Sequence, residues 1–94
     1  MFKITVSESG EVVLQGRLDA SQAEEATKEL NKVTSSAVVN FKDLEYISSA
    51  GFGVLIAAQR RLKQSGHELK LINLNNHIRD VFRYARFDLI FKIE

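Results

Sequence analysis

Two adjacent serines, Ser48 and Ser49, stand between an apolar run and a long helical pattern, and Gly51 and Gly53 follow them closely. A helix N-terminus has unpaired backbone N–H groups and the positive end of the helix dipole, so it favours an anion placed there. A serine at this point can cap the helix. It can also carry a phosphate that the neighbouring amides help to hold. The residue types leave both interpretations open, a structural cap and a phosphorylation switch.

The residue pattern argues against catalysis by either serine. A catalytic serine needs a base and an orienting group, but the two histidines, His67 and His77, fall in predicted loops. Ile47 occupies the first glycine position of a Gly-x-Ser-x-Gly elbow around Ser49. The sequence has no phosphate-binding loop of the Gly-x-x-x-x-Gly-Lys-Ser/Thr type, and no cysteine. We therefore expect no enzyme, no bound cofactor and no metal site.

Aspartates and glycines near the serines extend the candidate site. Asp19 and Asp43 come just after predicted strands, and ligands gather at the carboxyl ends of parallel strands. Asp19 can thus face Ser49 across that edge, or it can simply form a turn. Gly51 and Gly53 are unfavourable early in a helix by about 1 kcal/mol each relative to alanine. Close approach of another backbone, from the sheet or from a partner, explains them, and so does internal packing.

The elements that position the serines follow from the apolar pattern. Residues 37–41 form a short, nearly continuous apolar run, typical of a central strand covered on both faces, although its length alone does not exclude a helix. Residues 50–64 follow helical spacing, with Gly51, Leu55, Ala58 and Leu62 on one stripe. Gly66 is a natural left-handed residue at the helix end. A strand, a tight turn and a helix are therefore predicted around Ser48 and Ser49.

The rest of the chain supplies further strands and helices. Alternation over residues 2–6 and a turn at residues 8–10 predict a hairpin with a second strand over residues 11–15, and residues 16–19 break that pattern. A capping box from Ser21 to Glu24 starts a helix. Later segments are predicted as a strand over residues 69–74, a helix between residues 77 and 86, and a strand over residues 87–93.

This order, β-β-α-β-α-β-α-β, predicts an α/β fold: one domain over residues 1–94, with a mixed sheet of about five strands packed with about three helices. Crossovers beyond the first hairpin should be parallel and right-handed.

Composition narrows the choice of partners. Lysine and arginine number 13 against 12 acidic residues, a net charge of +1, so overall charge selects no polyanion. Arg79, Arg83 and Arg86 are best explained as a solvated helix face, and we expect no direct nucleic-acid binding. No apolar run approaches the roughly 20 residues needed to cross a bilayer, and the N-terminus lacks a signal-peptide pattern. A cytoplasmic protein without membrane insertion is expected.

Residues 43–55, Asp-Leu-Glu-Tyr-Ile-Ser-Ser-Ala-Gly-Phe-Gly-Val-Leu, strongly resemble the signature of STAS domains. These include the bacterial anti-sigma factor antagonists, whose pattern is Asp-Ser-Ser/Thr-Gly-Leu-Gly followed by an apolar helix. Residues 16–19, Gly-Arg-Leu-Asp, look like the second landmark of the family. The resemblance covers nearly the whole chain, with the same order of elements.

The resemblance implies a phosphorylation-controlled partner switch. Aligned on Gly51, the phosphorylated serine of the family falls on Ser49, with Ser48 as a second acceptor. The implied partners are an anti-sigma factor that is also a serine kinase using ATP, and a phosphatase that resets the switch. The unmodified form would bind the kinase and release a sigma factor. Asp19, Ser48, Ser49, Gly51 and Phe52 would face the partner.

Three features depart from the family pattern. Ser48 stands where many members have aspartate, and Ala50 where they have serine or threonine. The sequence ends at Glu94, where relatives commonly continue into another helix, so exposed apolar surface and a monomer or weak dimer are expected. The alternative function is a STAS subunit of a transporter or other signalling complex that is never phosphorylated.

Overall fold

The computed structural model describes residues 2–94. Its elements follow the predicted order, with two short 3-10 helices, η1 and η2, added. They are β1 (Phe2–Val6), β2 (Glu11–Leu18), η1 (Ala20–Gln22), α1 (Ala23–Leu30), β3 (Ala37–Ile47), α2 (Ser49–Lys63), β4 (Leu69–Ile72), α3 (Asn76–Tyr84), η2 (Phe87–Leu89) and β5 (Lys92–Ile93). The predicted α/β fold with a mixed five-stranded sheet is confirmed.

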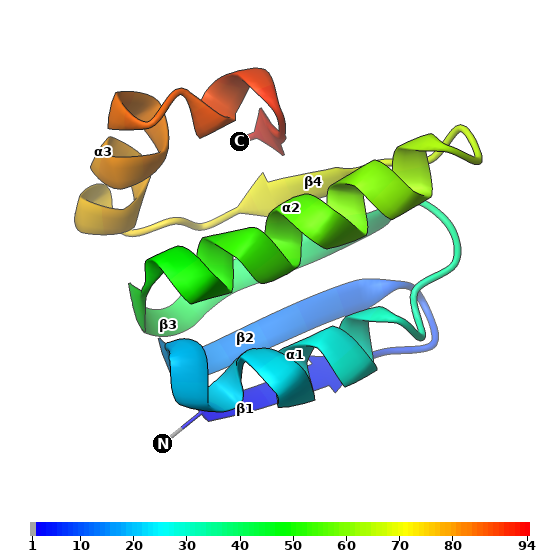
Figure 1. Ribbon diagram of the computed structural model, residues 1–94, viewed down its shortest axis with the longest axis horizontal. Helices are drawn as coiled ribbons and strands as arrows, with labels where there is room; N and C mark the ends of the chain where they lie inside the picture. Colours follow the sequence, from blue (N-terminus) through cyan, green and yellow to red (C-terminus); the bar gives the residue numbers. More distant parts are fainter. Residues whose placement is uncertain (1) are drawn as a thin grey trace.

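The five strands lie side by side in sequence order, β1-β2-β3-β4-β5. The first hairpin is antiparallel, and every later pair is parallel. Gly10 closes the hairpin at a positive φ of 88°, a conformation that glycine adopts without strain. The long helix α2 crosses the sheet in front of β3 and β4, and α1 runs beside it over β1 and β2 (Figure 1). This places β3 at the centre of the sheet, directly before α2.

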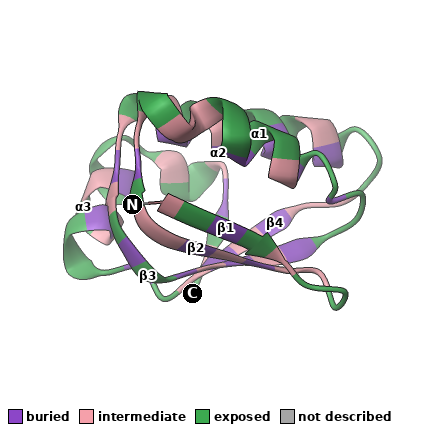
Figure 2. Cartoon of the chain, turned by 90° about the horizontal axis from the view of Figure 1, so that it is seen from below, coloured by how far each residue is buried: buried purple, intermediate pink, exposed green. Residues whose placement is uncertain are grey.

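The helices cover one face of the sheet, and the other face is open (Figure 2). Each new strand is added at the same edge of the growing sheet. Because the crossovers between parallel strands share one handedness, the helices that they contain pack on the same face of the sheet. Along β3, Ala37, Val39 and Phe41 are buried, whereas Val38 and Asn40 between them are half-buried. The expectation that this strand is covered on both faces is therefore wrong.

An aromatic cluster joins the second half of the chain. Phe52 of α2 lies with its ring centroid 5.0 Å from Phe82 of α3 and 5.0 Å from Phe87 of η2. Phe82 also contacts Phe41 of β3 and Phe91, at 6.0 Å each. Tilted and edge-on pairs at such distances are favourable beyond the area that they bury. The cluster fixes α3 and η2 against the start of α2.

Three strands differ from their predicted bounds by three residues or more. Strand β2 continues through residues 16–18, because a register shift at Gly16, with φ at 87°, absorbs the break in the pattern as a β-bulge. Strand β3 extends well past residue 41, to Ile47. The last predicted strand shrinks to Lys92–Ile93, because Phe87 turns into the aromatic cluster on a 3-10 helix.

Candidate functional site

The candidate site lies at the edge of the sheet where β2 and β3 end together. Leu18 and Ile47, the last residues of these strands, are paired in the parallel register. The backbone N–H of Ser48 donates to the carbonyl oxygen of Leu18 over 2.9 Å. The residues that follow the two strands, Asp19 and Ser48, therefore leave the sheet at the same edge. This is the carboxyl edge, where ligands of α/β sheets bind.

Ser48 is the cap of α2. Its backbone is extended, with φ −94° and ψ 176°, and its Oγ accepts a hydrogen bond from the backbone N–H of Gly51 at 3.4 Å. Its carbonyl oxygen accepts from the N–H of Phe52 at 3.0 Å, which begins the helical ladder. The cap interpretation thus applies to Ser48, whose hydroxyl is engaged within the fold.

Ser49 is the first residue of α2 and is exposed. Within the described residues 2–94 its hydroxyl has no hydrogen-bond partner, unlike that of Ser48. The first turn of α2 contains no acidic residue. A negative group on Ser49 would therefore meet the positive end of the helix dipole without a carboxylate in the same turn to repel it.

Gly51 is required by the close approach of α2 to the sheet. A Cβ atom at this position would lie 2.7 Å from Cγ1 of Ile47, 2.9 Å from Cγ of Leu18 and 3.0 Å from the Leu18 carbonyl oxygen. Close approach of the sheet therefore accounts for glycine at this position, and no partner is needed to explain it. Gly53 differs, because it is exposed and a Cβ there would meet nothing within 4 Å.

Asp19 caps the 3-10 helix η1. Its Oδ1 accepts from the N–H of Ser21 at 2.9 Å, and its own N–H donates to Oε1 of Gln22 at 3.1 Å. The capping box is therefore Asp19–Gln22, and the predicted box from Ser21 to Glu24 is wrong. The cap falls earlier because η1 precedes α1. Asp19 is half-buried, and its carboxylate serves the turn between β2 and η1.

Of the five residues expected to face a partner, two are buried. Gly51 packs against the strand ends, and the side chain of Phe52 is 8% exposed within the aromatic cluster. The expectation that the turn formed by Gly51 and Phe52 lies on the partner-facing surface is therefore wrong, because both residues are buried. The other three of the five residues, Asp19, Ser48 and Ser49, are at least partly exposed at this edge of the sheet.

Sequence reasoning missed two further residues at the same edge. Arg17 and Tyr46 are register partners on β2 and β3, and the guanidinium carbon lies 4.3 Å from the centre of the tyrosine ring. Because their neighbours Leu18 and Ile47 face the helices, this cation–π pair lies on the open face of the sheet. No local signal pairs them, because the register shift between Gly16 and Arg17 interrupts the alternation of β2.

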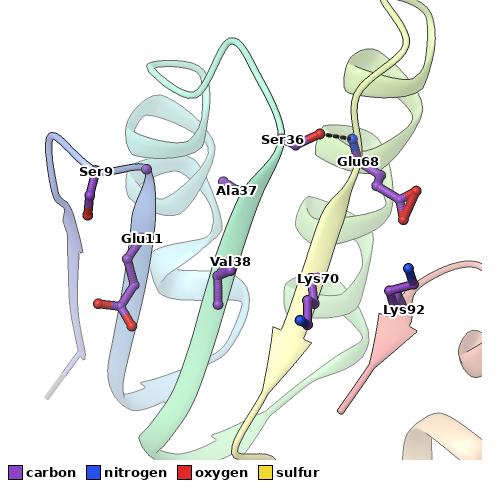
Figure 3. Close-up of a pocket in the computed structure, with 9 residues that line it drawn as sticks. Ser9, Glu11, Ser36, Ala37, Val38, Glu68, Lys70 and Lys92 are labelled. Carbon is purple, nitrogen blue, oxygen red and sulfur yellow. Dashed lines mark hydrogen bonds between the residues drawn. The ribbon is translucent and has the colours of Figure 1, made fainter.

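A separate hollow of about 520 Å³ lies at the opposite edge, where the parallel strands begin (Figure 3). Ser36 ties two of these strands, since its Oγ accepts from the N–H of Glu68 at 3.1 Å. Lys70 and Lys92 lie on neighbouring strands, and Lys70 is paired with Glu94 at 2.9 Å. With both signs of charge and at the amino edge, this hollow does not extend the candidate site.

In the part of the chain that the structure describes, no three histidine, aspartate or glutamate side chains gather where they could hold a metal ion. Over the same residues, no helix has both the length and the apolar character needed to cross a membrane.

The chain matches the family model described as MlaB, STAS domain, over residues 4–92. BtrV of Bordetella bronchiseptica, assigned as an anti-sigma factor antagonist, is 36% identical over 84 residues, which cover 85% of this chain and 72% of BtrV.

Solved structures agree on the fold. The Thermotoga maritima protein TM1081, assigned the same role, is 24% identical with a TM-score of 0.81, and the match covers 98% of this chain and 84% of that one. The anti-sigma factor antagonist SpoIIAA, in its unphosphorylated form, is 20% identical with a TM-score of 0.73, covering 100% of this chain and 87% of SpoIIAA. SpoIIAA of Bacillus in its phosphorylated form gives a TM-score of 0.72 at 20% identity, covering 100% and 91%.

Proposed function

Since the chain belongs to the STAS domain family, we propose that it is an anti-sigma factor antagonist whose partner binding is switched by phosphorylation of Ser49. The unmodified chain binds an anti-sigma factor that is also a serine kinase, and the bound sigma factor is released. The kinase transfers the γ-phosphoryl group of ATP to Oγ of Ser49, whose proton passes to a base on the kinase, and ADP leaves. The phosphorylated chain dissociates, and a phosphatase resets it.

The observation that carries this proposal is the different state of the two serine hydroxyls. Ser48 uses its Oγ to cap α2, whereas Ser49 is exposed, one residue further on, at the first position of the helix. A kinase needs a hydroxyl that it can reach without unravelling the helix start. Ser49 meets this requirement, and Ser48 meets it only if the cap is broken, at a cost of about 1 kcal/mol.

The electrostatics at the start of α2 explain how phosphorylation switches binding without unfolding the chain. A phosphate adds about −1.5 to −2 charges at neutral pH. The helix N-terminus stabilises a nearby negative charge by about 0.3–1 kcal/mol, and no acidic residue lies in the first turn. The fold therefore accepts the phosphate. A partner docked over the same edge would have to desolvate that charge, so the interface loses the complementarity that the free chain retains.

The relatives support the same switch. BtrV is assigned as an anti-sigma factor antagonist, and SpoIIAA adopts this fold both with and without phosphate. We extend these properties to this chain because its Ser49 has the register of the family phosphoacceptor.

A second candidate function is a STAS subunit of a transporter or another signalling complex that is never phosphorylated. The residue that favours this function is Ser48. It replaces the aspartate that stands directly before the phosphorylated serine in the family pattern. In this function Ser48 and Ser49 would both serve the start of α2 and its docking to a partner, and no kinase would act on them.

The test is a phosphorylation assay with the purified chain, ATP and candidate anti-sigma factor kinases from the same genome, followed by mass spectrometry of the product. We expect one phosphate, on Ser49, that disappears in Ser49→Ala. The matched control is Ser48→Ala, which removes the neighbouring hydroxyl and should still be phosphorylated. Failure of every kinase would contradict the proposal and favour the second candidate. Phosphate on Ser48 alone would contradict the assignment of the phosphoacceptor to Ser49 and would also exclude the second candidate.

A further inference from the structure

A second hollow lies along the C-terminal half of α2, away from Ser49. It is a shallow, open groove of about 550 Å³ between α2 and the residues at the end of η2. We call it the α2–η2 groove; its lining residues are Gln59, Arg60, Lys63, Gln64, Leu89 and Ile90.

The floor of the α2–η2 groove is fixed by Gln59, which is 2% exposed. Its Nε2 donates to the carbonyl oxygen of Ile90 at 2.8 Å, and its Oε1 accepts from the N–H of Leu69 at 2.7 Å. One side chain thus connects α2 both to β4 and to the segment after η2. A surface whose elements are fixed in this way is preorganised, so a ligand would not have to order it.

One wall of the α2–η2 groove presents an exposed apolar side chain. Leu89 is 80% exposed and is one of two large hydrophobic residues that are exposed within residues 2–94. Its exposure is imposed by its neighbours, because Phe87 packs in the aromatic cluster and the Ile90 carbonyl is held by Gln59. Covering this leucine would remove apolar surface from water, which favours binding of an apolar partner surface here.

The other wall of the α2–η2 groove is basic. Arg60 and Lys63 are both exposed and lie three residues apart on α2, so they share one side of the helix. Within the described part of the chain neither forms a salt bridge; the ion pairs found there involve Lys28, Lys32 and Lys70. Asp88, which directly precedes Leu89, does not line this groove. It lines a different hollow with Arg79 and Arg83. The wall is thus left for a negatively charged ligand.

We propose that the α2–η2 groove binds an acidic amphipathic helix of another protein. The apolar face of that helix covers Leu89 and Ile90, and its carboxylates meet Arg60 and Lys63. Helices that dock in this way use apolar anchors one turn apart, and flanking charges set their orientation. The occupant is a helix because the apolar side chain of Leu89 and the two cations one turn apart on α2 match the apolar face and the acidic flank of such a helix.

Docking in this groove is independent of the state of Ser49. Arg60 lies roughly 16 Å along α2 from Ser49, at 1.5 Å per residue. Exposed charges separated by more than about 8–10 Å are largely screened at physiological ionic strength. A phosphate on Ser49 therefore leaves the groove open, and the chain can hold one partner here while it releases another at the carboxyl edge of the sheet.

The test uses a fluorescein-labelled helical peptide with leucines on one face and glutamates beside them, followed by anisotropy and by amide NMR of the whole chain. We expect saturable binding, with shift changes centred on the groove. Leu89→Asp, and the double variant Arg60→Glu with Lys63→Glu, should each weaken binding by about tenfold or more. A peptide with lysine in place of glutamate should instead prefer the double variant. Lys28→Glu, a charge reversal on α1, is the matched control and should leave affinity unchanged.

Absence of saturable binding would overturn the proposal, as would shift changes centred elsewhere or equal affinity of all variants. Binding to phosphatidylglycerol vesicles without binding to the peptide would overturn it in favour of a lipid surface. Amide spectra of Leu89→Asp establish that the variant is folded. The assay needs neither kinase nor phosphate, so its result is separate from that of the Ser49 switch.

Discussion

The backbone N–H of Ser48 donates to the carbonyl oxygen of Leu18 over 2.9 Å, which ties the start of α2 to the end of β2. Gly51 allows this contact, since any larger residue would strike Ile47 and Leu18. The exposed hydroxyl of Ser49 is therefore held at a fixed place relative to Asp19, which follows Leu18. A partner would recognise a rigid edge and not a mobile loop.

Gly51→Ala should destabilise the chain by about 1–3 kcal/mol. The added methyl group would lie 2.7 Å from Cγ1 of Ile47 and 3.0 Å from the Leu18 backbone oxygen, so α2 must shift. Urea unfolding measures the loss. Gly53→Ala is the matched control: nothing lies within 4 Å of its Cβ, and alanine should stabilise the helix by up to about 1 kcal/mol. Equal effects of the two substitutions would contradict this account of Gly51.

Ser48→Ala and Ser49→Ala should differ in stability. Loss of the Ser48 cap should cost about 1 kcal/mol, because the N–H of Gly51 loses its acceptor. Ser49→Ala should stay within about 0.5 kcal/mol of the original chain, as expected for an exposed site without contacts. Denaturant melts of both variants check the assignment. A larger loss for Ser49→Ala would reverse the roles of the two serines.

Gln59→Leu should cost about 2–4 kcal/mol. The leucine has a similar volume, but it leaves the N–H of Leu69 and the carbonyl of Ile90 without the partners that Gln59 supplies. Gln64→Leu, at the exposed end of the same helix, is the control and should be nearly neutral. The measurement is again the free energy of unfolding. A neutral Gln59→Leu would mean that the two hydrogen bonds contribute little.

Periodicity predicted the order of the elements because each buries one apolar face, and the motif around Gly51 predicted the family. Phe52 and Gln59 are both buried and share the stripe of Leu55 and Leu62 at helical spacing. The stripe predicted from the sequence includes neither residue, and the family resemblance alone places Phe52 toward a partner. A glutamine on an apolar stripe signals a buried residue with backbone partners.

Other features depend on contacts distant in sequence. Which face of the sheet stays open follows from the direction of successive crossovers, and no local pattern in residues 37–41 records it. Likewise, the Arg17–Tyr46 pair depends on the register between β2 and β3. The division of roles between Ser48 and Ser49 depends on where α2 begins, to within one residue, and a sequence pattern places helix ends less closely than that.

The central claim is that a charge on Ser49 releases the partner. The most direct measurement is the affinity of the anti-sigma factor kinase for the chain with and without phosphate on Ser49, by calorimetry, with Ser49→Ala as the uncharged control. We predict that the unmodified chain and Ser49→Ala bind alike, and that the phosphorylated chain binds at least about tenfold more weakly, because the interface must desolvate the phosphate. Equal affinity of the phosphorylated and unmodified chains would contradict the switch.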